Sequence, residues 1–213
     1  MKSGYESRFD PSNEDLVLDE LGEAFPAALI HAVDYARDRY AAFAASGLGL
    51  APLFTPRTVA NVLHDLLWYS LAQDLHGVEG ITLVDGHPLR MIVRRCGDRE
   101  YRIRMKRHRE RDMISSYPTK TDLKFYEGKD QTFEGFEVVN LAAGYRWDQI
   151  FGEIVCPVLS YREGKANVVW TVEPSGETGV TALTPVNPVP PQIDLIDVLA
   201  EMEEIDQTGK MGS

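Results

Sequence analysis

The sequence has little cysteine and no long apolar run. Its two cysteines, Cys96 and Cys156, lie far apart and fit neither a disulfide framework nor a zinc motif, so we expect a reducing compartment. The longest stretches without charge, near residues 47–56 and 180–193, are too short and too rich in glycine or proline to span a bilayer. The first residues lack the apolar centre of a signal peptide. We therefore expect a cytoplasmic protein with no membrane association.

Signatures of catalysis and cofactor binding are also missing. The sequence has no phosphate-binding loop, no dinucleotide-binding glycine pattern, no His-Glu-x-x-His zinc motif and no serine elbow, so we expect neither a cofactor nor a metal. Acidic residues are in excess, with 33 Asp and Glu against 22 Lys and Arg and a net charge of −11, while 44% of the residues are apolar. This composition is typical of a soluble globular protein of one or two domains.

The N-terminal part of the chain has a helical pattern. Residues 1–23 form an acidic arm, which we expect to be solvated and partly helical after Asn13. Residues 24–46 carry apolar side chains at three- and four-residue spacing, the pattern of one helical face. A second helix is predicted from an N-cap at Thr55, followed by a proline, to Gly77. We expect the two helices to pack as an αα-hairpin.

After residue 80 the apolar period changes to two, which is typical of strands. Short spacings favour antiparallel pairing, because a parallel connection needs a dozen or more residues. The predicted fold class is α+β, an N-terminal αα-hairpin packed on an antiparallel β-sheet in a single domain at residues 24–173. A proline-rich linker at 174–191 and a short acidic helix at 192–213 follow. The expected strands cover residues 81–84, 89–95, 100–107, 136–142, 153–161 and 167–173.

The largest charge asymmetry lies in a basic hairpin, residues 90–111, with ten Lys and Arg against three acidic residues. A three-residue loop at residues 96–98 would gather the apolar side chains of both strands on one face. A two-residue loop would instead place Arg94 opposite Tyr101 and mix the faces, so we expect the three-residue loop. It predicts one continuous exposed basic face, formed by Arg90, Arg94, Arg102, Arg104 and Lys106.

Like charges lie opposite one another in this predicted register, so the basic face needs solvent or an anion over it. Three interpretations stay open. The face is solvated and neutralised by the acidic arm or tail, or it contacts an acidic protein surface, or it binds nucleic acid phosphates. The net charge of −11 argues against nucleic acid, because the whole molecule would repel phosphates at long range.

The C-terminal tail, residues 192–213, combines six acidic residues and one lysine with apolar residues at helical spacing. A helix this short is not stable alone, so we expect it to dock, either on its own domain or in a groove of a partner protein. The docking residues would be Leu195, Val198, Leu199, Met202 and Ile205.

One pair of residues on the predicted second helix has the spacing of a catalytic motif. Arg57 and His64 lie seven residues apart and project from one face, which resembles the arginine–histidine motif of HEPN ribonucleases. In that resemblance the arginine would hold a phosphate and the histidine would assist attack by a 2′-hydroxyl. With fifteen arginines and five histidines, about one such match is expected by chance, so a packing or surface role for His64 is the competing interpretation. HEPN domains are also all-helical.

Residues 138–174 begin with VVNLAAGYRWDQIFGEIVCPVL and end, after a short turn, with ANVVWTVEP. This segment resembles the C-terminal half of small bacterial proteins encoded beside helix-turn-helix genes, in arrangements similar to toxin-antitoxin modules. The resemblance implies a protein partner, with a helix-turn-helix protein as a candidate, and implies nothing about catalysis. Our hypothesis is a protein-protein interaction component of a paired system, an antitoxin or a regulatory partner. The alternative is a nuclease-like effector that binds RNA or DNA through the basic hairpin.

Overall fold

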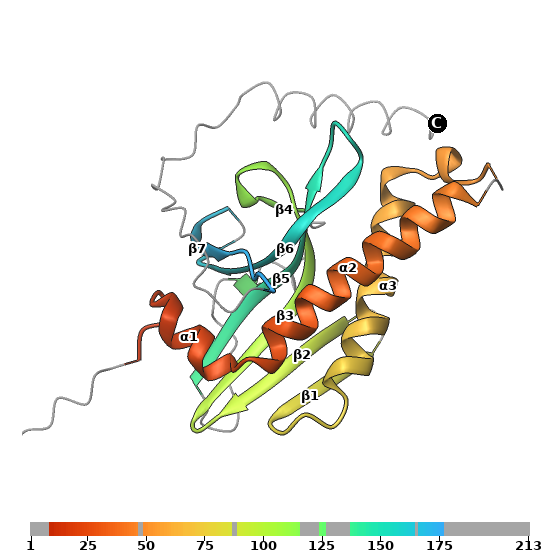
Figure 1. Cartoon of the computed structure of the whole chain (residues 1–213). Helices are drawn as coiled ribbons and strands as arrows, with labels where there is room; N and C mark the ends of the chain where they lie inside the picture. Colours follow the sequence, from red (N-terminus) through yellow and green to blue (C-terminus); the bar gives the residue numbers. More distant parts are fainter. Residues whose placement is uncertain are drawn as a thin grey trace, which may run out of the picture.

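The chain has an α+β architecture in which helices cover one face of a mixed β-sheet (Figure 1). The computed structural model describes residues 9–46, 49–86, 89–115, 124–126, 137–164 and 166–176. None of its described helices is both long enough and apolar enough to cross a bilayer. The helical elements are α1 (Glu14–Leu21), α2 (Ala24–Ala45), η1 (Ala51–Leu53), α3 (Pro56–Leu75) and η2 (Glu110–Asp112). The strands are β1 (Ile81–Gly86), β2 (Leu89–Cys96), β3 (Arg99–His108), β4 (Ile114–Ser115), β5 (Glu137–Asp148), β6 (Glu153–Arg162) and β7 (Val168–Val172).

The helices begin where the sequence provides capping side chains. The Asn13 side chain accepts a hydrogen bond from the backbone N–H of Leu16 and starts α1. The Thr55 hydroxyl accepts from the backbone N–H of Thr58 at 3.2 Å and starts α3. These local interactions explain why the predicted start of the second helix at Thr55 is confirmed.

The sheet has the strand order β1-β2-β3-β5-β6-β7, with the short β4 beside β3. All the predicted strands are present, and their bounds agree within two residues except that β5 extends to Asp148, beyond the predicted end at residue 142. The neighbouring strands are antiparallel except for β3 and β5, which are parallel, so the prediction of an entirely antiparallel sheet is wrong at this pair. The connection between them, residues 109–136, is long enough for the crossover that parallel pairing requires.

The main core lies between the helices and one face of the sheet, here called the helix face. Helices α2 and α3 pack on one another and contribute Leu29, Val33 and Leu63, all fully buried, while Leu141 from β5 closes the core from the sheet. Helix α1 belongs to the same core through two buried side chains, Val17 and Leu21. The acidic arm is therefore only partly solvated, contrary to expectation, because α1 has an apolar side as well as acidic residues.

The loop of the basic hairpin differs from the prediction. Arg94 lies opposite Tyr101 and Cys96 lies opposite Arg99, so the turn between β2 and β3 contains only Gly97 and Asp98. Gly97 has φ +58°, the left-handed conformation that the first residue of such a two-residue turn requires. The three-residue loop is therefore wrong by one residue, and this shift exchanges the two faces of β2 relative to β3.

The exchange divides the predicted basic face. Ile92 now shares the helix face with Tyr101 and Ile103, and Arg90 and Arg94 lie on that side with it. On the opposite face, Val93 lies across from Arg102. The prediction of one continuous exposed basic face is therefore wrong. The helix side holds Arg90 and Arg94, and the opposite face holds Arg102, Arg104 and Lys106, all five of them partly buried.

The helix face can contain arginines as well as apolar residues because the charged ends of the arginines lie at the edge of the core. The Arg94 guanidinium donates to the backbone carbonyls of Glu20 and Glu79, so its charge is hydrogen-bonded although the side chain is partly buried. Most of the linker and the whole tail lie outside the described residues, so the tail helix and its docking residues Leu195, Val198, Leu199, Met202 and Ile205 stay predictions.

Candidate functional site

On the helix face, the acidic arm neutralises part of the basic hairpin. The Arg99 guanidinium donates to both carboxylate oxygens of Glu20, at 2.7 Å for Nε, and the Tyr101 hydroxyl donates to the same carboxylate at 2.5 Å. Arg99 also lies over the Phe9 ring, 4.3 Å from its centroid. Burial opposes ionisation of Glu20, but the hydrogen bonds from Arg99 and Tyr101 outweigh it and lower the pKa of Glu20.

A second group on the same side surrounds Arg90. Its guanidinium donates to Asp85 at 3.1 Å and to Asp65, and Asp85 also accepts from the Trp68 indole N–H at 2.9 Å. His64 stands beside this group, with Nδ1 3.5 Å from a terminal nitrogen of Arg90. Burial, followed by the positive charge of Arg90, lowers the pKa of His64. The imidazole of His64 is therefore neutral near pH 7.

Arg57 and His64, the candidate catalytic pair, both lie on α3, and a catalytic role for them stays a prediction. Arg57 is exposed near the start of α3, and the cation with the largest effect on His64 is Arg90 from β2, followed by Lys106. Asp65 and Asp85 already occupy the Arg90 guanidinium, so a phosphate would have to compete with two carboxylates. Sequence reasoning missed this arrangement because the contact joins two elements far apart in the chain.

The opposite face of the sheet carries further cations of the hairpin. Glu100 is 5% exposed and accepts hydrogen bonds from Arg95 at 2.9 Å and from Arg102 at 2.8 Å. Arg104 lies over the Phe125 ring, 3.9 Å from its centroid, and Lys106 follows on the same strand face. Four cations of the hairpin, Arg95, Arg102, Arg104 and Lys106, therefore lie on this face together with Glu100.

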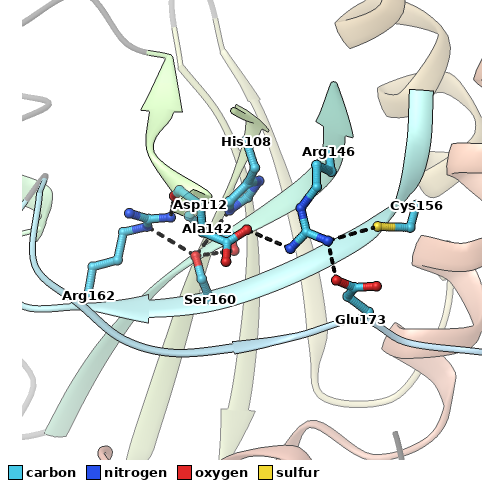
Figure 2. Close-up of polar contacts among 8 residues, drawn as sticks. All are labelled: His108, Asp112, Ala142, Arg146, Cys156, Ser160, Arg162 and Glu173. Carbon is cyan, nitrogen blue, oxygen red and sulfur yellow. Dashed lines mark hydrogen bonds and ion pairs between the residues drawn. The ribbon is translucent and has the colours of Figure 1, made fainter. Parts of the chain in front are cut away.

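A polar cluster extends this face across β5, β6 and β7 (Figure 2). Arg146 on β5 donates to the carboxylate of Asp112 at 2.6 Å and to that of Glu173. Arg162 on β6 donates from Nε to the Ser160 hydroxyl at 3.1 Å and from a terminal nitrogen to the backbone carbonyl of Asp112. The two arginines thus hold one aspartate through different oxygens.

His108 lies at the buried end of the polar cluster (Figure 2). Its Nε2 is 3.1 Å from the Ser160 hydroxyl, and both residues have no exposed surface. Burial, then the charges of Arg162 and Arg146, lowers the pKa of His108 to about 3, so the ring is neutral. A serine beside a neutral histidine has the chemistry of a nucleophile and its base, but no substrate reaches a fully buried pair. We assign this pair a structural role.

The polar cluster also fixes a strained turn. Arg111 and Asp112 both have left-handed backbone conformations, with φ of 56° and 55°, which non-glycine residues adopt at a cost. The hydrogen bonds from Arg146 and Arg162 to Asp112 hold this conformation. The sequence contains no signal for the cluster, because its members come from four separate elements and the residue after β7, and they show no characteristic spacing. Its members are His108, Asp112, Arg146, Ser160, Arg162 and Glu173.

Within the described ranges, no group of three or more His, Cys, Asp or Glu residues is suited to bind a metal ion. No protein-family model, curated protein or solved structure matches the chain. The site must therefore be interpreted from its own geometry and charge.

Proposed function

We propose that the chain is a protein-protein interaction component of a paired bacterial system, of the toxin-antitoxin or regulatory kind. In this proposal the basic part of the sheet face opposite the helices contacts an anionic surface of the partner. The observation that carries it is the concentration of cations on this face of β2 and β3, where Arg95, Arg102, Arg104 and Lys106 lie close together and Glu100 accepts from two of them.

Carboxylates of a protein fit this face better than nucleic acid phosphates. Glu20, Asp65 and Asp85 neutralise the helix side of the hairpin, which removes part of the field that would attract a polyanion. The net charge of −11 opposes phosphate binding at long range. A small group of cations inside an acidic molecule suits a local contact with acidic side chains, where charge complementarity provides specificity.

The test compares partner binding after charge reversal of cations on the sheet face with binding after charge reversal of cations on the helices. We expect Arg104→Glu combined with Lys106→Glu to weaken binding to the purified product of the neighbouring gene by roughly tenfold or more. The matched control, Arg39→Glu combined with Arg57→Glu, makes the same change of charge on exposed helical positions and should leave binding unchanged. Equal losses in both variants would contradict the proposal, because they would indicate a nonspecific effect of net charge.

The same variants test nucleic acid directly. Titration with a short duplex DNA and a short RNA should give little binding at physiological salt. Tight binding that weakens steeply with salt and is lost only in the Arg104 and Lys106 variant would overturn the proposal in favour of a nucleic acid ligand.

The alternative function is a nuclease-like effector that binds RNA or DNA through the basic hairpin. The observation in its favour is His64, a partly exposed histidine whose lowered pKa leaves it able to accept a proton beside Arg90. We expect His64→Ala to leave any cellular activity intact. A folded His64→Ala protein that loses RNA cleavage, compared with active wild type, would establish the alternative instead.

A further inference from the structure

The turn between β5 and β6 exposes two large apolar side chains. Ile150 is 84% exposed and Phe151 is 75% exposed. We call this pair the apolar tip. Figure 1 shows the cyan end of the β5–β6 hairpin projecting beyond the rest of the sheet. Single exposed apolar residues are common on proteins, but two adjacent ones at the end of a projecting hairpin form a compact anchor.

The backbone of the apolar tip is held in one conformation. The Asp148 side chain accepts hydrogen bonds from the backbone N–H of Ile150 at 2.7 Å and of Phe151 at 3.0 Å. The N–H of Gly152, which has φ +67°, donates to the Asp148 carbonyl at 2.9 Å and closes the turn. A preorganised turn loses little conformational entropy when it binds, so its apolar side chains can contribute more to affinity.

The strand next to the apolar tip is also anchored. The Arg37 side chain on α2 donates to the backbone carbonyls of Ile154, at 3.2 Å, and Val155, at 3.1 Å. These bonds tie the start of β6 to the helical layer, so the apolar tip stands at a fixed position relative to the rest of the molecule.

Two carboxylates flank the apolar tip. Asp148 and Glu153 lie directly opposite one another at the end of the ladder, and like charges in this position are destabilising unless a cation lies over them. In the part of the chain that the structure describes, neither carboxylate forms an ion pair. Among the described residues, the hairpin end therefore combines an apolar anchor with two carboxylates that have no cationic partner.

We infer that the apolar tip inserts into an apolar pocket on a partner protein whose rim carries lysine or arginine. The inference rests on the proposed function for the existence of a protein partner, and it adds a second contact surface and the chemistry of that partner. The pocket would bury Ile150 and Phe151, and its basic rim would neutralise Asp148 and Glu153.

The negative charge of the hairpin end favours a basic protein over an anionic membrane or a second copy of the chain. An anionic membrane would repel Asp148 and Glu153 at the depth where Phe151 inserts. A second copy of the chain carries a net charge of −11 and would be repelled as a whole. A basic protein with an apolar pocket is complementary both to the exposed apolar side chains and to the two carboxylates of the hairpin end.

The experiment uses the full chain with a photo-crosslinking amino acid in the native host, at position 151 or at position 53. Leu53 is the matched control, because it is also apolar and 75% exposed but lies in η1. We expect a basic protein to be cross-linked from position 151 and not from position 53. The purified partner should bind Ile150→Ser/Phe151→Ser roughly 30-fold or more weakly, Glu153→Lys about tenfold more weakly, and Leu53→Ser with wild-type affinity.

Several outcomes would overturn the inference. They are the absence of a specific cross-link at position 151, unchanged affinity of the Ile150→Ser/Phe151→Ser variant, and tighter binding by Glu153→Lys. Cross-linking to a second copy, with a dimer in sedimentation that this double variant dissociates, would show self-association instead. Binding to phosphatidylglycerol vesicles that is lost in the same variant would indicate a membrane.

The test separates this inference from the proposed function. If Arg104→Glu/Lys106→Glu loses the partner and Ile150→Ser/Phe151→Ser keeps it, the inference fails and the proposed function stands. The opposite result would retain the apolar tip and remove the basic face. Both apolar side chains are exposed, so the serine variants should melt at the wild-type temperature.

Discussion

The two faces of the sheet bury different kinds of side chain. The helix face is covered by α1, α2 and α3 and holds a large apolar core, with charged groups such as Arg94 only at its rim. The opposite face has a small apolar cluster of Ile114, Phe125, Tyr126 and Ala142, and next to it the buried His108 and Arg162 of the polar cluster. Apolar packing on one face is matched by hydrogen-bonded ion pairs on the other.

This difference predicts different responses to mutation. A large apolar core tolerates changes that conserve volume, because its contacts are numerous and nondirectional. A buried polar network depends on each donor and acceptor, since loss of one partner leaves another buried without compensation. The polar face should therefore be the more sensitive of the two to conservative substitution.

Gly144→Ala should give the largest effect, because it acts where β3 and β5 join. An added Cβ would lie 2.0 Å from the backbone carbonyl oxygen of Lys106, and Gly144 has φ +150°. The carbonyl belongs to the adjacent strand and cannot move aside cheaply, so we expect a loss of about 3 kcal/mol or more in the free energy of unfolding. Urea denaturation measures it. Gly176→Ala, where nothing lies within 4 Å, is the control and should be neutral.

Arg146→Met should have the next largest effect. It leaves the Asp112 carboxylate, whose side chain is only 15% exposed, without its cation, and it releases Glu173. Because Arg146 itself is 27% exposed, we expect a loss of about 2 to 3 kcal/mol, less than for a fully buried pair. Arg95→Met is the matched control, since Glu100 keeps Arg102, and it should cost less than about 1 kcal/mol. Equal costs would show that the cluster has no special role.

His108 should make the stability of the polar face depend on pH. Its pKa of about 3 lies below the ordinary histidine value of 6.5, so below pH 6.5 the unfolded chain binds a proton that the folded chain does not. The free energy of unfolding should therefore decrease as the pH is lowered through this window, by about 2 kcal/mol from pH 7 to pH 5.

His108→Gln should remove this dependence, which urea midpoints at the two pH values would reveal. The pKa of His64 is shifted in the same direction, so His64→Gln is the control, with a smaller change because its side chain is partly exposed. An unchanged pH dependence in the His108 variant would contradict the assignment.

Glu20→Gln should have the smallest effect and tests the helix face. The neutral amide weakens the bonds from Arg99 and Tyr101 that attach α1, so we expect a loss of about 1 to 2 kcal/mol and faster amide exchange in α1. Asp19→Asn makes the same change of charge at an exposed position of the same helix and should have little effect. Equal exchange rates in the two variants would show that Glu20 does not anchor the helix.

The helices and strands could be predicted because their signals are local. The cap at Thr55 and the alternation along β3 depend on residues adjacent in the chain, and both are confirmed. The β2–β3 register depended on one assumption, that apolar residues share a face, and failed because Arg94 finds carbonyl acceptors at the rim. The parallel pairing of β3 and β5 has no local signal at all.

The candidate site was the least predictable part. The cations of the hairpin were visible as composition, but their partners were not, because Glu20 and Asp65 come from other elements. Nothing in the sequence indicated that Arg146, Arg162 and His108 meet, since such a cluster exists only once the sheet has formed. Exposure of Ile150 and Phe151 was equally invisible, because apolar residues in a strand-rich segment are ordinarily buried.

The parallel pair has a consequence for how the chain folds. Strands β1 to β3 and strands β5 to β7 are two local antiparallel meanders, and among the described strands only the β3–β5 ladder joins them. Contacts between residues far apart in the chain form late, because closing the long connection costs entropy before the contacts compensate for it. We expect each meander to form early and the β3–β5 ladder to limit the folding rate. A substitution such as Val139→Ala in that ladder should therefore slow folding more than it speeds unfolding.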